Sequence, residues 1–365
     1  MSRPVRVCLV GPSLDILGGQ AVAAERLRQR LQGLDGVTVD FLAVNPRLPG
    51  PLRLMQRVKY LRTVVTSIAY VTSLLLRAWR YDVLHVFSAS YWSFLLAPTP
   101  AILIGRLFGR AVILNYRSGE ADDHLTRHGK VALPVMRLAS VIVTPSDYLV
   151  EVFARFGLPA RAILNFVEME RFHHRERRTP CPRFFSNRNF ETLYGVDDVI
   201  RAFGVVQASV PAAELTLVGD GSERPMLERL VRELGLRNVR LVGRVAPSDM
   251  PAQYEAADIY LNASRIDNMP QSILEAYASG TAVVTTDAGG IPFIVRQEQT
   301  GLMAPVGDWK ALGEAALRLL TEPGLAFRLA SAGFRECEAK YSGEANVLQW
   351  RALYQSLVQR ERSAA

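Results

Sequence analysis

Short apolar runs alternate with segments of helical periodicity along the whole chain. This alternation predicts parallel sheets built from strand–helix–strand units. Strands are predicted at residues 5–10, 38–43, 83–87, 111–115 and 141–144, and a second series starts at 184 and continues at 214–218, 239–242, 259–261 and 282–285. A charged segment without apolar period, residues 173–183, lies between the two series. The pattern therefore predicts an α/β protein of two Rossmann-like domains with a cleft between them, where ligands bind at the carboxyl ends of the strands.

One segment, residues 53–80, combines an apolar stripe with positive charge. Its apolar positions recur at steps of three and four, the period of an amphipathic helix: Leu54, Val58, Leu61, Val65, Ile68, Thr72, Leu75 and Trp79. No acidic residue occurs between Phe41 and Tyr81, and the basic residues there contribute +7 of the chain's net +8: Arg47, Arg53, Arg57, Lys59, Arg62, Arg77 and Arg80. Such a helix can lie on an anionic membrane surface. The alternative is that the stripe packs on the N-terminal sheet and the arginines are solvated.

Length and composition agree with a two-domain globular protein. The 365 residues suit two cores, and 49% apolar with 21% charged residues excludes a disordered chain. Three distant cysteines exclude a zinc knuckle or a disulfide framework. The uncharged stretch 64–76 is shorter than the roughly 20 residues of a spanning helix, and the apolar run near the N-terminus is short enough for a strand. We therefore expect a cytoplasmic protein, held peripherally on the inner face of the membrane, with no nucleic-acid partner.

Two carboxylates eight positions apart, Asp267 and Glu275, carry the most specific chemistry in the sequence. A helix is predicted after Asp267, with Pro270 near its start and Gly280 as its left-handed C-cap. The backbone N–H groups of Gln271 and Ser272 would then face an anion such as a phosphate. A phosphate flanked by two carboxylates suggests a nucleotide-sugar site. The alternative is an exposed loop acid followed by a helix glutamate that the helix dipole favours.

The whole run D-x7-E, A-x-A-x-G-x-x-V-V and G-G-I-P, residues 267–292, resembles the signature of retaining glycosyltransferases of family 4, with Asp267 where the family usually has Glu. The resemblance implies the GT-B fold. Residues 1–170 would form an acceptor-binding domain, residues 171–340 a nucleotide-sugar-binding domain, and residues 341–365 a C-terminal helix that crosses back to the N-terminal domain.

Further positions match the family in order along the chain. Arg188 follows the first strand of the second domain, where the family has an arginine that clamps the donor diphosphate. The nucleotide-sugar site would comprise Gly18, Gly19, Gly219, Gly221, Arg244, Met269, Gln271 and Ser272, with Arg188, Asp267 and Glu275 as the catalytic residues. In this scheme Asp267 would hold the sugar and Glu275 the ribose hydroxyls.

Three departures from the family concern the same sites. Tyr194 stands where a lysine is expected, and Arg201 or Arg117 could replace that cation. Phe293 stands where the family often has Glu. After the strand at 111–115, no histidine stands where many relatives place one that contacts the sugar. The candidates for the acceptor side are His85, Tyr116, Arg117 and Glu120, among which a strand-end histidine such as His85 is more often structural.

The resemblance implies metal-independent transfer of a sugar from a UDP- or GDP-sugar, with retention at the anomeric carbon, to a lipid-linked or polysaccharide acceptor. No cofactor and no metal are expected. Two alternatives stay open: a degenerate GT-B protein that binds a nucleotide sugar without transfer, and a GT-B epimerase or phosphorylase.

Overall fold

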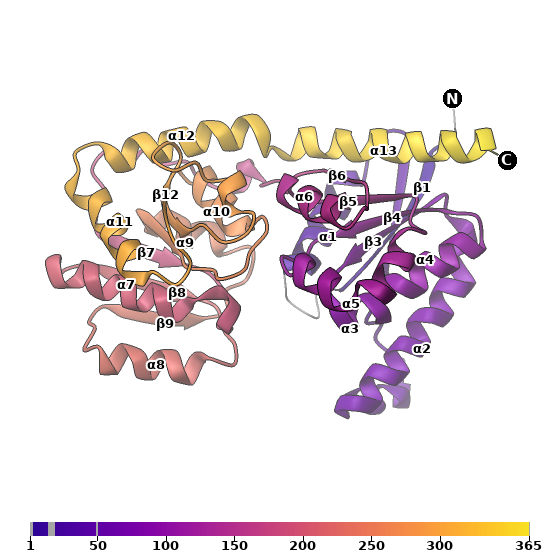
Figure 1. Ribbon diagram of the computed structural model, residues 1–365, viewed down its shortest axis with the longest axis horizontal. Coiled ribbons are helices and arrows are strands. Elements are labelled where there is room, and N and C mark those ends of the chain that lie inside the picture. The colour runs from indigo at the N-terminus through magenta and orange to yellow at the C-terminus, as the bar shows by residue number, and fades with distance from the viewer. Residues whose placement is uncertain (1–2, 14–18, 49, 365) are drawn as a thin grey trace. The chain divides into compact units, whose positions relative to one another are not determined.

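The chain forms two compact units (Figure 1), which a computed structural model describes for residues 3–13, 19–48 and 50–364. One unit contains Met1–Leu164 together with Glu344–Ala365, and the other contains Asn165–Gly343. The helix α13 (Gly343–Ala364) therefore belongs almost entirely to the N-terminal unit, although it is last in sequence.

The N-terminal unit is built on a six-stranded parallel sheet of order β2-β1-β3-β4-β5-β6. The strands are β1 (Val5–Gly11), β2 (Val37–Ala43), β3 (Val83–Ser88), β4 (Ala111–Tyr116), β5 (Val141–Thr144) and β6 (Ala160–Ala162). The helices are α1 (Gly19–Leu31), α2 (Lys59–Arg77), α3 (Tyr91–Leu96), α4 (Pro98–Leu107), α5 (Ala121–Met136) and α6 (Asp147–Arg155). Strand order reverses between β1 and β3, the kind of point where α/β folds bind ligands.

Alternation along β1 divides the apolar side chains of this unit between two cores. Val5, Val7 and Leu9 pack with α1 and with Trp350 of α13. Cys8 and Val10 face the other way, toward α2, α4, α5 and α6. Since side chains of a strand point alternately to opposite faces, helices cover both sides of the sheet and the strands are buried.

The C-terminal unit has a second six-stranded parallel sheet, of order β12-β11-β10-β7-β8-β9. Its strands are β7 (Arg183–Ser186), β8 (Glu214–Val218), β9 (Val239–Gly243), β10 (Ile259–Asn262), β11 (Ala282–Thr286) and β12 (Leu302–Ala304). Its helices are α7 (Val196–Ser209), α8 (Arg224–Glu233), α9 (Met250–Ala256), α10 (Gln271–Ala278), α11 (Trp309–Thr321) and α12 (Leu325–Lys340). This is the Rossmann strand order, which reverses between β7 and β10.

The predicted α/β class with two Rossmann-like domains is confirmed, whereas the prediction for residues 53–80 needs correction. That segment is three helical pieces: η1 (Gly50–Arg57), α2 and η2 (Ala78–Arg80). The extended backbone of Val58 (φ −91°, ψ 122°) separates η1 from α2, and Arg77 (φ −121°, ψ −27°) separates α2 from η2. The alternative, that the predicted stripe packs on the sheet, is wrong for most of it: Val58, Leu61, Ile68, Thr72, Leu75 and Trp79 are exposed. The buried side chains of α2 and η2 are instead Tyr70, Leu74 and Ala78.

Candidate functional site

The strand reversal in the C-terminal sheet brings Arg188 and Asp267 together. Arg188 follows β7, and Asp267 lies in the loop between β10 and α10. The Arg188 guanidinium forms an ion pair with the Asp267 carboxylate, and only 11% and 12% of the two side chains are exposed. Arg188 Nη1 also lies 3.3 Å from Ser272 Oγ, at the start of α10. Residues far apart in sequence thus place the Arg188 guanidinium at the N-terminus of α10, where an anion is favoured.

Tyr194 completes the surroundings of Arg188. It ends the short helix η4 (Thr192–Tyr194), and the Arg188 Cζ lies 4.2 Å from the centroid of its ring. Burial lowers the pKa of Arg188, but the Asp267 carboxylate and then Tyr194 outweigh this effect, so that the pKa is raised. The residue at the family's lysine position therefore holds the neighbouring arginine through a cation–π contact.

Glu275 lies on the second turn of α10, as predicted, and is bound to a residue that the sequence analysis missed. The buried Tyr254 Oη, from α9, lies 3.2 Å from Glu275 Oε2, 3.0 Å from the Ser272 carbonyl and 3.1 Å from Asn187 Oδ1. Burial first and Glu275 second raise the pKa of Tyr254, so its hydroxyl stays protonated and donates. A tyrosine in an amphipathic helix has no local pattern that distinguishes this role from core packing.

Gly219 and Gly221, predicted to let a nucleotide approach the backbone, pack tightly against the loop that follows β7. A Cβ on Gly219 would lie 2.0 Å from the Arg188 carbonyl oxygen, and one on Gly221 would lie 2.4 Å from that of Phe190. Gly219 also has a φ of 149°. The turn after β8 therefore supports the loop that carries Arg188, and only glycine fits against that backbone.

Met269 and Gln271 contact the segment that opens the C-terminal unit. Asn165 donates from Nδ2 to the Met269 carbonyl at 2.8 Å, and Gln271 donates from Nε2 to the Phe166 carbonyl at 2.9 Å. The two side chains therefore hold this segment beside α10, which the sequence analysis did not anticipate. Helix α10 begins without a side-chain cap, so the backbone N–H groups of its first residues are not bonded by a capping side chain. Arg244 is exposed, directly after β9.

The acceptor-side candidates lie at the carboxyl ends of β3 and β4 in the N-terminal unit. Tyr116 Oη lies 2.7 Å from Ser90 Oγ and 2.8 Å from His124 Nδ1. Arg117 is half-buried, its Cζ lies 5.8 Å from the Phe87 ring centroid, and burial lowers its pKa to about 10. Burial and then Asp123 raise the pKa of Glu120.

Tyr91 joins this group, although the sequence did not indicate it. Its φ of 56° is rare for a bulky residue, and its hydroxyl donates to the Asp123 carboxylate. Its ring lies 5.3 Å from that of His124. Strained backbone of this kind concentrates at functional sites.

Three predicted residues remain: Gly18, Gly19 and His85. Gly18 lies outside the described residues, while Gly19 is the first residue of α1. His85 is fully buried, with its Nδ1 2.7 Å from Tyr354 Oη and its Nε2 2.9 Å from Asn115 Nδ2. The structure thus places His85 within the packing between the sheet and α13. Among the described residues, no group of three or more His, Cys, Asp or Glu side chains could hold a metal ion.

Comparison with solved structures defines the class of protein. The chain superposes on sucrose-phosphate synthase of Thermosynechococcus elongatus with a TM-score of 0.77 at 20% identity, covering 98% of this chain and all of that one. It superposes on HepE of Anabaena, solved in complex with UDP and glucose, with a TM-score of 0.75 at 17% identity, covering 96% and 100%. Two parallel six-stranded sheets with these neighbours define a GT-B fold.

The sequence comparisons show which proteins the chain is similar to. Residues 184–322 match the family model described as Glycosyl transferases group 1. The chain is 28% identical over 273 residues to glycogen synthase of Mycobacterium tuberculosis, covering 70% of this chain and 64% of that protein. It is 32% identical over 168 residues to a GDP-mannose-dependent monoacylated α-(1-6)-phosphatidylinositol monomannoside mannosyltransferase of Corynebacterium glutamicum, covering 42% and 44%. The matches span less than two thirds of these relatives. The matches support a glycosyltransferase similar to those of group 1, with the family model confined to residues 184–322 of the C-terminal unit.

Proposed function

We propose that the chain is a retaining glycosyltransferase that moves a sugar from a UDP- or GDP-sugar to a lipid-linked or polysaccharide acceptor. One observation carries the proposal: Arg188 is held in a buried position, by Asp267 and Tyr194, against the N-terminus of α10. A buried arginine at a helix N-terminus suits a diphosphate, which it can chelate in a bidentate way. Relatives named for GDP-mannose and a neighbour solved with UDP support both nucleotides as candidates.

In the proposed reaction the bond between the anomeric carbon and the donor diphosphate breaks. The acceptor oxygen bonds to the same face of that carbon, and its proton passes to an oxygen of the leaving diphosphate. Arg188, the Ser272 hydroxyl and the first N–H groups of α10 would stabilise the charge that develops on the diphosphate. The diphosphate would take Arg188 from Asp267, leaving that carboxylate to accept hydrogen bonds from the sugar. Glu275, positioned by Tyr254, would accept from the ribose.

The acceptor and the location are further parts of the proposal. Tyr116, Arg117 and Glu120 are the residues of the N-terminal unit proposed to meet the acceptor. The basic residues around 53–80 would draw the protein to the anionic inner face of the membrane, where a lipid-linked acceptor is found. Neither cofactor nor metal takes part in the proposed chemistry.

The test is nucleotide release from a panel of UDP- and GDP-sugars, with and without EDTA. Arg188→Ala should lower kcat/KM by about 100- to 1000-fold, the typical cost of one donor that stabilises a transition state. Glu275→Ala should mainly raise KM, and Arg232→Ala, an exposed arginine on α8, should change neither. The anomeric configuration of the product, read by NMR, should match that of the donor.

Other results would point to the remaining candidates. Tight donor binding without release from any donor would indicate a degenerate nucleotide-sugar-binding protein. Conversion of the sugar without an acceptor would indicate an epimerase. Loss of activity in EDTA that Mg²⁺ restores would contradict the metal-independent mechanism.

A further inference from the structure

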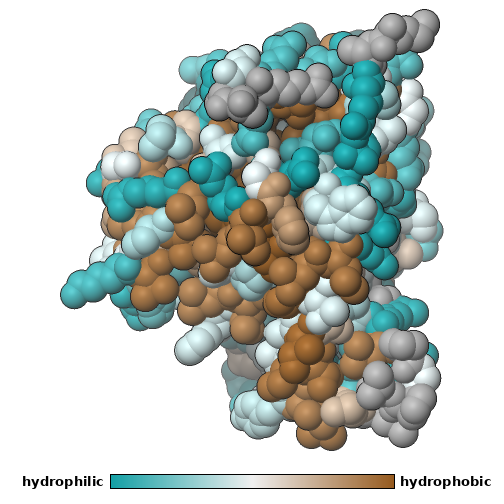
Figure 2. All heavy atoms as spheres, turned by 90° about the vertical axis from the view of Figure 1, so that its right-hand side faces the viewer, coloured by the Kyte–Doolittle hydropathy of each residue, from teal (hydrophilic) through white to brown (hydrophobic). Residues whose placement is uncertain are grey.

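The helices α2, α3 and α4 of the N-terminal unit leave large apolar side chains in solvent. Figure 2 shows a face of the molecule on which hydrophobic residues gather. The exposed apolar side chains of these helices include Val64, Ile68, Leu76, Trp92, Leu103 and Leu107. Ile68 is 62% exposed and Leu107 is 74% exposed. Contiguous apolar surface of this kind marks an interaction site.

The exposure follows from how the helices pack on the sheet. Tyr70 and Leu74 of α2 enter the core, and the Tyr70 hydroxyl donates to the Ala97 carbonyl at 2.8 Å. Ile68 lies two positions before Tyr70 and so points about 200° away from it around the helix. In α4, Ala101 and Ile102 are buried while Leu103 is exposed. Both helices therefore use one apolar face for the fold and present a second one outward.

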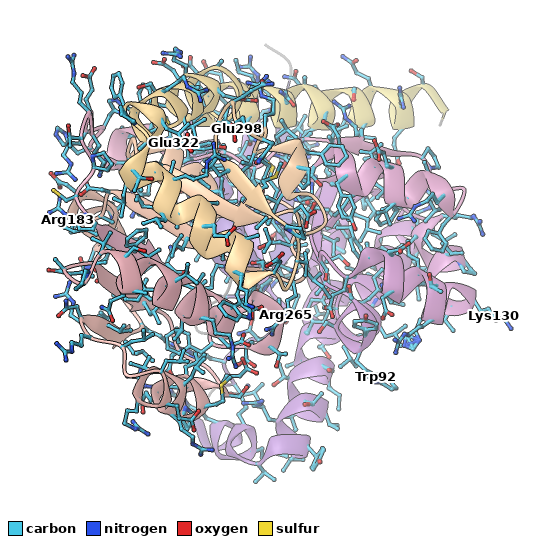
Figure 3. All side chains as sticks on the ribbon, turned by 60° about the vertical axis from the view of Figure 1, so that its left-hand side comes forward. Trp92, Lys130, Arg183, Arg265, Glu298 and Glu322 are labelled. Atoms are coloured by element: carbon cyan, nitrogen blue, oxygen red, sulfur yellow. The ribbon has the colours of Figure 1, made fainter. Side chains whose placement is uncertain are left out.

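An aromatic side chain and the surrounding charges indicate the kind of partner. Trp92, 76% exposed, stands off α3 into solvent (Figure 3). Residues 41–119 contain ten basic residues and a single acidic one, Asp82, which already pairs with Arg3 and Arg6. Arg62, Arg77, Arg80 and Arg106 are all exposed. A second copy of this chain would bring like charges together, whereas an anionic bilayer offers both apolar volume and complementary charge.

We propose that the outer apolar face of α2, α3 and α4 inserts into the boundary between headgroups and acyl chains of an anionic bilayer. The inference rests on the proposed function, which places the lipid-linked acceptor at the membrane. It adds that hydrophobic insertion, and not attraction by basic residues alone, holds the protein on the bilayer. Insertion removes apolar side chains from water, which is favourable by about 25 cal/mol for each Å² of apolar surface buried. Electrostatic attraction to the headgroups does not bury this surface. Binding should therefore persist at salt concentrations that screen surface charge.

The orientation of α2 in this arrangement is parallel to the membrane. The segment Tyr60–Arg80 is long and apolar enough to cross a membrane by length and composition, and 17% of its 18-residue apolar window is buried in the structure. Tyr70, Leu74 and Ala78 nevertheless belong to the core of the N-terminal unit. A spanning helix would have to leave that core, so the packed state favours an interfacial position.

The experiment is flotation of the full chain with vesicles of phosphatidylcholine alone or with 30% phosphatidylglycerol, at about 0.1 M and 0.5 M salt. Ile68→Gln and Leu107→Gln should each lower partitioning at least about tenfold, at both salt concentrations, since each replaces an inserted apolar side chain with a polar one. Leu234→Gln, at an exposed leucine (44%) after α8, is the matched control and should bind like the wild type. Brominated lipid should quench the fluorescence of Trp79 and Trp92 and spare the buried Trp350.

Different outcomes would overturn the inference or leave the proposed function intact. Equal binding of wild type and both glutamine variants, or binding abolished by 0.5 M salt, would rule out insertion. A salt-stable dimer that the same variants dissociate, without vesicle binding, would assign the surface to a second copy. Resistance to alkaline carbonate extraction would indicate a spanning helix instead. Donor-nucleotide release, measured without vesicles, should be unchanged in all three variants, so failure of the donor chemistry is a separate result.

Discussion

Tyr194 illustrates how one residue can replace another by acting on a third. The family's lysine would contact the diphosphate directly, whereas the ring of Tyr194 lies against the guanidinium of Arg188. In the proposed mechanism the ring would keep Arg188 in place when a diphosphate draws it from Asp267. A cation–π contact of this kind contributes about 0.5–2 kcal/mol. Tyr194 is therefore a positioning residue in the proposed mechanism.

We expect Tyr194→Ala to weaken donor binding by about 2- to 30-fold, the equivalent of that contact energy. Tyr194→Phe should bind the donor nearly as well as the wild type, because it keeps the ring. Isothermal titration with the nucleotide diphosphate measures its affinity for each variant, and KM and kcat for the donor show whether binding or turnover changes. Equal loss in Tyr194→Ala and Tyr194→Phe would show that the hydroxyl acts, and the positioning role would then be wrong.

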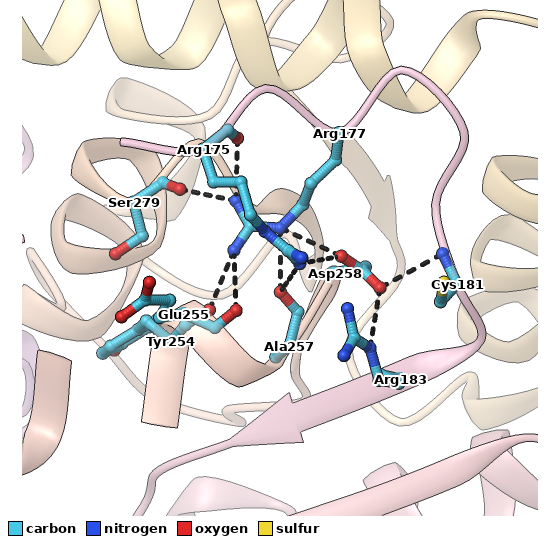
Figure 4. A network of polar contacts seen from close by, with 9 residues as sticks. All are labelled: Arg175, Arg177, Cys181, Arg183, Tyr254, Glu255, Ala257, Asp258 and Ser279. Carbon is cyan, nitrogen blue, oxygen red and sulfur yellow. Dashed lines mark hydrogen bonds and ion pairs between the residues drawn. The ribbon is translucent and has the colours of Figure 1, made fainter. Parts of the chain in front are cut away.

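At the scale of elements, the buried Arg177 and its neighbouring arginines hold together the start of β7, the end of α9 and the end of α10 (Figure 4). Arg177 donates to the carbonyls of Tyr254 at 3.0 Å, Ala257 at 2.8 Å and Ser279 at 2.6 Å. Its Nε also donates to Asp258, the same carboxylate that pairs with Arg175 and Arg183. The last carbonyls of a helix have no partner within it, and here one side chain serves two helix ends.

Arg177→Met should destabilise the C-terminal unit by about 3–5 kcal/mol, since it leaves Asp258 with less compensation and removes donors from several buried carbonyls. Urea unfolding of the full chain, followed by circular dichroism, measures the loss. Arg178→Met is the matched control. The Arg178 side chain is 79% exposed, pairs at the surface with Glu176 and lies 5.7 Å from the Phe327 ring centroid, so a loss of about 1 kcal/mol or less is expected. Similar midpoints for both variants would contradict this role of Arg177.

The strands and helices that carry these sites could be predicted because buried parallel strands are continuous apolar runs. The edge strands β6 and β12 were missed, since each has three residues and no run to detect. The stripe of α2 was assigned by its period, yet both faces of that helix are apolar, and period alone does not say which face meets the core.

The candidate site was predictable only as far as its local spacing. Asp267, Glu275 and the start of α10 lie within nine residues, so a short loop and the first two turns of one helix relate them. Tyr254 comes from another helix, and the ion pair of Arg188 with Asp267 joins residues 79 positions apart. Such contacts depend on strand order, which the sequence pattern leaves open.

At the scale of the whole molecule, His85 couples the last helix of the chain to the first sheet. Asn115 Nδ2 can only donate, so it donates to Nε2, and the ring proton sits on Nδ1, which donates to Tyr354 Oη. This arrangement requires a neutral imidazole. The ring also lies 4.4 Å from that of Trp350. Burial, and next the charge of Arg117, lower the pKa of His85 to about 3.

The pH dependence of stability follows from this lowered pKa. Below the unfolded pKa of about 6.5, the unfolded chain binds a proton that the folded chain refuses until about pH 3. Stability is therefore complete above pH 6.5 and is lost as the pH falls, by about 1.4 kcal/mol per unit. His124, whose pKa burial lowers to about 4, acts with the same sign. Together they should weaken the N-terminal unit progressively between pH 6.5 and 5.

His85→Asn should reduce that pH dependence by about 2 kcal/mol between pH 6.5 and 5, although it lowers stability at pH 7 by removing buried contacts. Urea midpoints of the wild type and the variant at several pH values give the slope, which a loss of packing alone leaves unchanged. His173→Asn, at an exposed position, should keep the wild-type slope. If the His85→Asn and wild-type curves ran parallel, the protonation of His85 would not be linked to unfolding, and α13 would be held to the sheet by apolar packing alone.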